Sequence, residues 1–292
     1  MSSSFSNNLA SQERRAAISL AMIYAFRMLG LFMILPVFAL YSDKLPGATP
    51  LLMGIALGIY GLTQAILQIP FAMWSDKIGR KPVLYIGLLI FAIGSIVAGS
   101  AQTIEGIILG RALQGAGAIA ATLMALAADL SREEQRLKMM AMIGASIGAA
   151  FALSMVIGPM INAWIGISGI FYGTAVLALI GILILYFIVP DPLHSHFHRD
   201  AQLKTSSLGD VFRDKELLRL DAGIFILHFV LMSLFLVMPL LLRDLVELAP
   251  EKHWQLYIPV FAVSLVVMLP FIILAERKQA MKPVFVGAIV AS

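Results

Sequence analysis

The sequence predicts an all-α protein that crosses a lipid bilayer several times. Of its 292 residues, 60% are hydrophobic and only 13% are charged, whereas a soluble domain is about half apolar and about a quarter charged. The apolar residues also fall into runs of roughly 20, the number that a helix needs to cross a bilayer core of about 30 Å. A water-soluble surface cannot be built from this composition.

Eight complete spans and one partial span are expected. Most connections are short, so neighbouring helices run antiparallel, but residues 190–216 form a long polar segment. We expect this segment to be a cytoplasmic linker between an N-terminal six-helix bundle, residues 1–189, and a partial second bundle, residues 217–292. The expected spans are 16–41, 51–74, 82–100, 103–128, 139–164, 169–189, 217–242 and 254–275, with a partial span from residue 283.

The positions of the basic residues predict the orientation. Lysine and arginine accumulate on the cytoplasmic side of membrane proteins. With the N-terminus inside, only Lys44, Arg243 and Lys252 of the 21 basic residues fall in outer loops, and only Arg27 and Arg111 fall within spans. The pI of about 9.4 is therefore attributed to clusters that face lipid headgroups, and a nucleic-acid partner is not expected.

A weak internal repeat indicates two six-helix halves with the same orientation. Its matches occur in order and at nearly one displacement. A second half of equal length would extend on the order of 100 residues beyond Ser292, so the chain is expected to be a fragment or a truncated protein. The matches are 31–36 (LFMILP) with 234–239 (LFLVMP), 69–71 (IPF) with 269–271 (LPF), and 81–83 (KPV) with 282–284 (KPV).

Two motifs carry a resemblance to the major facilitator superfamily. Residues 72–81, AMWSDKIGRK, resemble its signature loop, G-x-L-x-D-[RK]-x-G-R-[RK], with Ala72 in place of the first glycine. Residues 111–118, RALQGAGA, are similar to its fourth-helix pattern, R-x-x-Q-G-x-G. The resemblance covers essentially the whole chain, narrows to the YajR-type inner-membrane exporters, and implies alternating access around a midplane cavity.

The fifth span resembles the antiporter motif of proton-driven drug exporters. It contains Gly144, Gly148 and the pair Gly158 and Pro159, whereas Ser154 stands where the motif has glycine. The glycines predict close helix packing, and the Gly-Pro pair predicts a bend near the outer end of this span. By resemblance, Gly158 and Pro159 are gating residues that let the two bundles rock.

The loop between the second and third spans supplies the other gating candidates. Asp76 and Arg80 lie four residues apart, within ion-pair reach on a helical turn, and Gly79 permits backbone angles that other residues resist. Asp129, at the cytoplasmic end of the fourth span, is expected to approach Arg80. The resemblance implies that these residues and Lys81 latch the inner gate, while the alternative is a solvated cytoplasmic loop.

Polar residues within the spans are the candidates for a substrate or proton path. Arginine inside a bilayer costs on the order of 2.5–3.5 kcal/mol on insertion scales, so Arg111 either faces a cavity or extends to the headgroups. Tyr60, Gln64 and Gln68 form one stripe on the second span, which serves either substrate or interhelical hydrogen bonding. His228 is expected to be a buried histidine that couples protons or bonds between helices. The candidates are Tyr24, Arg27, Tyr60, Gln64, Gln68, Arg111, Gln114 and His228.

The function expected from this resemblance is proton-driven export of a small amphiphilic compound across a bacterial inner membrane. The expected partners are the small-molecule substrate, protons and the lipid bilayer, and a monomer is expected. No span carries paired carboxylates, a set of metal ligands or a nucleophile with a base, so an enzyme is not expected, and neither is a cofactor. The alternative is a truncated, non-transporting membrane protein that only binds a ligand or a partner.

Overall fold

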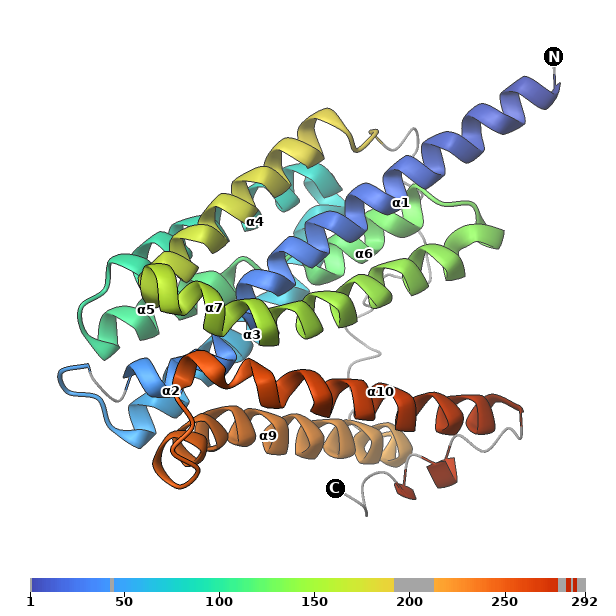
Figure 1. Cartoon of the computed structure of the whole chain (residues 1–292). Coiled ribbons are helices and arrows are strands. Elements are labelled where there is room, and N and C mark those ends of the chain that lie inside the picture. The colour runs from blue at the N-terminus through green and yellow to red at the C-terminus, as the bar shows by residue number, and fades with distance from the viewer. Residues whose placement is uncertain (1, 43–44, 192–212, 278–281, 285, 288–292) are drawn as a thin grey trace. The chain divides into compact units, whose positions relative to one another are not determined.

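The computed structural model describes residues 2–42, 45–191, 213–277, 282–284 and 286–287, and in these ranges the regular structure is entirely helical (Figure 1). Six helices in them are long and apolar enough to cross a membrane, which confirms the predicted fold class. The elements are α1 (Ser2–Phe32), α2 (Leu35–Ser42), α3 (Pro50–Ile78), α4 (Arg80–Ser100), α5 (Ile104–Ala116), α6 (Ala120–Asp129), α7 (Glu133–Phe187), α9 (Lys215–Asp244), η2 (Pro250–Lys252) and α10 (Trp254–Arg277).

The chain divides into two compact units, Met1–Gln202 and Leu203–Ser292. The division falls within the segment expected to be a linker. Most of that segment, residues 192–212, lies outside the described residues, so its limits and its cytoplasmic position stay predictions.

Six expected spans of the N-terminal unit are present, although two of them are broken and two are joined. The first span consists of α1 and α2, because Pro36 has no N–H to continue the helical hydrogen bonds and α1 ends at Phe32. The fourth span consists of α5 and α6, separated at residues 117–119. The fifth and sixth spans form α7, which leaves helical geometry at Gly166 with φ of 67°, a backbone angle that favours glycine.

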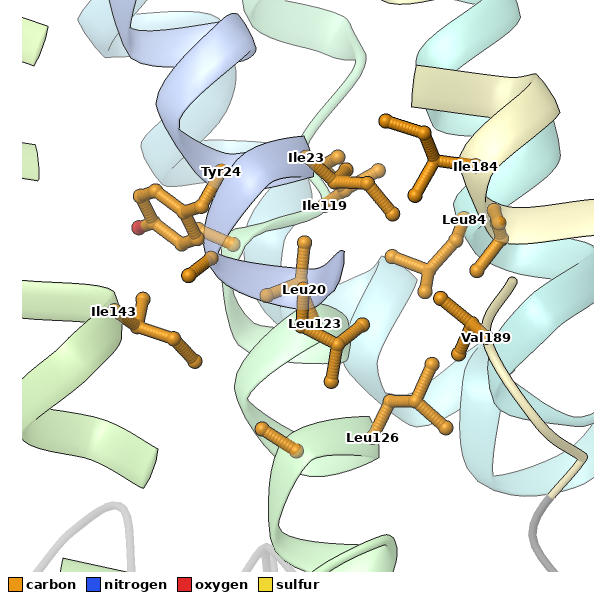
Figure 2. Close-up of a cluster of buried hydrophobic side chains, with 14 of the residues drawn as sticks. Leu20, Ile23, Tyr24, Leu84, Ile119, Leu123, Leu126, Ile143, Ile184 and Val189 are labelled. Atoms are coloured by element: carbon orange, nitrogen blue, oxygen red, sulfur yellow. The ribbon is translucent and has the colours of Figure 1, made fainter. Parts of the chain in front are cut away.

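The core of this unit lies where α1, α4, α6 and the end of α7 meet. Figure 2 shows Leu20, Leu84, Leu123 and Leu126 directed toward one another, and each is buried. Helix α1 packs mainly on α7, and α4 packs on α5 and α7. The apolar faces of four helices are thus covered by one another, leaving their opposite faces for the membrane.

The C-terminal unit contains the seventh and eighth expected spans. Asp214 caps α9, because its carboxylate accepts hydrogen bonds from the backbone N–H groups of Glu216 (3.0 Å) and Leu217 (3.2 Å). Helix α10 begins after the short helix η2, and residues 282–284 and 286–287 of the expected partial span are helical. The parallel relation between the two halves stays a prediction.

Candidate substrate site and cytoplasmic gate

Two arginines lie inside the N-terminal helix bundle. Arg27 on α1 is 2% exposed and Arg111 on α5 is 1% exposed. Because neither side chain is presented on the surface, the alternative that Arg111 extends to the headgroups is wrong. Both guanidinium groups are held inside the protein, where each must find polar partners.

Each arginine is bound by neutral oxygen atoms. Arg27 donates from Nη2 to Oε1 of Gln64 (3.0 Å) and to the carbonyl of Gly117 (3.4 Å). Arg111 donates from Nη1 to Oε1 of Gln114 (3.0 Å) and from Nε to the carbonyl of Ala56 (3.4 Å). The break between α5 and α6 provides the Gly117 carbonyl, which the sequence pattern did not indicate.

Tyr60 lies between the two guanidinium groups. Its ring centroid is 4.8 Å from Cζ of Arg111 and 5.8 Å from Cζ of Arg27, and the Phe91 ring centroid is 5.7 Å from the Arg27 Cζ. Such cation–π contacts stabilise a desolvated cation by about 2 kcal/mol or more. The second span therefore supplies an aromatic face and not a counterion.

The polar stripe on α3 continues from this cluster toward the end of the helix at Ile78. Gln64 donates to Gln68 (3.4 Å), and both side chains are partly exposed. Gln114, fully buried, donates to the hydroxyl of Ser95 (2.7 Å), a partner that sequence analysis missed because it lies on another helix. Tyr24 instead belongs to the apolar core (Figure 2), and its place in the path stays a prediction.

The cluster keeps several buried polar atoms without hydrogen bonds. In the described part of the chain, these include Nε and Nη1 of Arg27 and the hydroxyl oxygen of Tyr60. Buried polar groups are almost always paired in proteins, so each such atom calls for a water or a ligand. The cluster of Arg27, Tyr60, Gln64, Arg111 and Gln114, called the arginine cluster below, is the candidate substrate site.

The charged residues at the junction of α3 and α4 form the predicted ion pairs, although both helices extend into the expected loop and only Gly79 separates them. Arg80 pairs with Asp76 and donates from Nε to Asp129 (3.2 Å), whose side chain is 1% exposed. Gly79 has φ of 99°, which confirms the need for glycine there. Ser75 was missed: its buried hydroxyl accepts a hydrogen bond from Arg80 (2.6 Å). The geometry of the cluster is confirmed, whereas its gating role stays a prediction.

Lys81 connects the start of α4 to the end of α7. Its Nζ donates to the carbonyl of Val189 (2.6 Å) and pairs with Asp191 (2.8 Å). Val189 follows the last turn of α7, where helical carbonyls have no intrahelical partners. Lys81 therefore caps the end of the sixth span, immediately before the expected linker.

Replacing Lys81 by methionine is expected to cost about 1.5–3 kcal/mol of local stability, because a part-buried charged hydrogen bond to the helix end is lost. Hydrogen exchange of residues 184–191 should then accelerate by about tenfold or more. The matched control is Lys77→Met, since Lys77 lies in the last turn of α3, close to the same junction, and is exposed. Equal exchange in both variants would show that Lys81 does not hold this helix end.

Another contact missed by sequence analysis joins α1 to the loop before α7. The Glu13 carboxylate accepts hydrogen bonds from the backbone N and the Nε of Arg132, both at 2.9 Å, and from its Nη2 at 2.8 Å. This carboxylate raises the pKa of Arg132. The contact fixes the N-terminal part of α1, which begins at Ser2 and thus well before residue 16, where the first span was expected to start.

The glycines of the fifth span differ in their surroundings. A Cβ atom on Gly158 would lie 2.5 Å from the carbonyl oxygen of Met33, so α7 packs tightly where α1 ends. By contrast, a Cβ atom on Gly144 or Gly148 would meet nothing within 4 Å, so the prediction that these two pack closely is wrong for this structure. Helical geometry is interrupted at Gly166; the roles of Gly158 and Pro159 as gating residues stay predictions.

His228 is not buried, contrary to prediction. It lies exposed on α9, and its Nδ1 is 2.9 Å from the carbonyl of Ile224 on the same helix. Among the described residues, the buried histidine is His253, just before α10, with Nε2 3.1 Å from the Leu248 carbonyl. Hydropathy indicated that His228 lies within a span, but it cannot say which face of that helix is covered by protein.

The helices of the described residues are those of a polytopic membrane protein. The family description "Major Facilitator Superfamily" matches residues 20–292. The chain therefore belongs to the major facilitator superfamily, a family of membrane transporters and not of enzymes.

Similar proteins agree with this membership. The chain is 47% identical over 274 residues to the inner membrane transport protein YajR of Escherichia coli K12, covering 94% of this chain and 60% of that protein's length. It is 35% identical to a transporter of Buchnera aphidicola, covering 92% of this chain and 69% of that one. A solved bacterial homologue of the human lysosomal transporter Spinster, inward-facing and unoccupied, matches with a TM-score of 0.73 and 14% sequence identity. The match covers 91% of this chain and 63% of that chain.

Proposed function

We propose that this chain acts in secondary active transport, exporting a small amphiphilic compound by alternating access in exchange for protons. The observation that carries this proposal is the arginine cluster, a set of buried cationic and polar side chains inside a membrane-spanning bundle. Intramembrane ionisable residues are costly, and they usually mark substrate or ion pathways. The solved relatives supply the fold, and the antiporter motif of the fifth span supplies the expected direction.

In this proposal the Arg80 cluster closes the cytoplasmic side. Asp76, Asp129 and Ser75 hold Arg80 between α3, α4 and the end of α6, and Lys81 attaches the same loop to the end of α7. A rigid cluster at one end of the bundle can serve as a latch whose opening changes access to the interior. The N-terminus is placed in the cytoplasm of a bacterial cell, and the working unit is a monomer.

Proton-coupled flux tests the transport proposal. Purified protein in liposomes containing a pH-sensitive dye should move protons when amphiphilic candidate compounds are added. Arg111→Gln is expected to reduce this flux by about tenfold or more, because a charged buried hydrogen bond contributes about 1.5–3 kcal/mol. Arg14→Gln, a change of the same charge at an exposed position, should leave the flux unaltered.

The alternative, a protein that binds without transporting, predicts a different outcome. Compound binding without any proton flux in the wild-type protein would contradict transport and favour the binding function. For proton coupling, His228 stays the candidate. Unchanged pH dependence of the flux in His228→Ala would exclude that role.

A further inference from the structure

We propose that the arginine cluster binds the carboxylate of an amphiphilic organic anion. This inference rests on the proposed transport function and names the class of substrate for the same site. The proposed function does not specify the charge of the small amphiphilic compound. The positive charges and the unpaired hydrogen-bond donors of the cluster favour a negatively charged one.

The charge balance of the cluster is the first argument. Arg27 and Arg111 are 2% and 1% exposed, and neither forms an ion pair with an acid among the described residues. Their hydrogen-bond acceptors are amide and carbonyl oxygens. Buried charges are normally paired, so two guanidinium groups near one tyrosine ring create a strong local preference for a negative group.

The unused hydrogen-bond donors are the second argument. Arg27 uses only Nη2, while its Nε and Nη1 are buried without a partner, as is the hydroxyl of Tyr60. A guanidinium group donates only, and it binds carboxylates more strongly than neutral oxygens. A carboxylate offers about four acceptor positions, which matches the excess of donors, whereas an ammonium group would add donors and be repelled.

The surroundings of Arg27 suit the apolar part of such a ligand. The side chains of Phe91, Ala92 and Ala178 are buried next to Tyr60, with Leu31 packed against them. Along α3, the partly exposed Gln64 and Gln68 lead from the helix surface to Arg27. The Oε1 atom of Gln64 occupies an Arg27 donor, so an incoming carboxylate would replace a neutral acceptor by a charged one.

Matched naphthalene probes test this inference by isothermal titration of the full chain in detergent. We expect 2-naphthoate to bind at least about tenfold more tightly than the neutral 2-naphthamide or the cationic 2-naphthylmethylammonium. Tyr60→Phe removes only a hydroxyl that makes no hydrogen bond, so the fold should be preserved while naphthoate affinity falls severalfold. Arg27→Gln should abolish the preference, and Arg14→Gln on the same helix should keep it.

Several results would overturn the proposed anion site. The first is naphthoate binding that is absent or no tighter than binding of the amide. The second is a preference for naphthoate over the amide that persists in both Arg27→Gln and Tyr60→Phe. The third is displacement of naphthoate by equimolar chloride, which would indicate an inorganic-anion site. The transport function is judged separately. Naphthoate-selective binding without flux would refute transport and support the anion site. Proton-coupled flux of a cation without naphthoate binding would support transport and refute the anion site.

Discussion

Replacing Arg80 by glutamine is expected to lower the free energy of unfolding by about 3–5 kcal/mol. The Asp129 carboxylate that it contacts is 1% exposed, and Arg80 itself is 11% exposed. Removal of the guanidinium would leave a carboxylate buried without that cation, which is much costlier than the loss of a surface pair. Denaturation of the purified protein in mixed micelles with increasing sodium dodecyl sulfate measures the change.

The matched control is Arg219→Gln on α9. Arg219 pairs with Glu216 at 2.8 Å, but both side chains are more than 70% exposed (73% and 76%), so its removal should change stability little. The double variant Arg80→Gln with Asp129→Asn should recover part of the loss, because the buried charge is then removed as well. A loss for Arg80→Gln no larger than that of the control would contradict the buried character of this pair.

Replacing Gly94 by alanine is expected to destabilise the protein by about 1–3 kcal/mol, even though alanine favours helices by about 1 kcal/mol over glycine. A Cβ atom on Gly94 would lie 2.5 Å from the backbone nitrogen of Gln114 and 2.8 Å from the carbonyl oxygen of Gly110. Backbone atoms cannot move aside as side chains do, so α4 and α5 would have to separate. The same denaturation measurement, with thermal unfolding beside it, reports the change.

Gly58→Ala provides the comparison, since Gly58 is an exposed helical glycine whose added Cβ would meet nothing within 4 Å. That variant should be neutral or more stable by up to about 1 kcal/mol. Because Gln114 belongs to the arginine cluster, Gly94→Ala should also weaken ligand binding, and Gly58→Ala should not. Equal stability of the two variants would show that α4 and α5 do not approach so closely.

The sequence by itself determined the features that depend on composition and on position along one helix. Runs of apolar residues are sufficient to place membrane-spanning helices, because helix rise and bilayer thickness are fixed. The contact between Asp76 and Arg80 followed from their four-residue spacing, and the turn at Gly79 followed from the backbone angles that only glycine adopts readily. The family was likewise indicated by the signature loop.

Only the tertiary structure decided which groups meet across different helices. Arg27 reaches Gln64 and Gly117, Lys81 reaches Val189, and Glu13 reaches Arg132, at separations of 37, 90, 108 and 119 residues along the chain. Helical periodicity reports which residues share a face, but packing determines which neighbour covers that face. For that reason the excess of positive charge in the arginine cluster could be recognised only after the helices had been placed together.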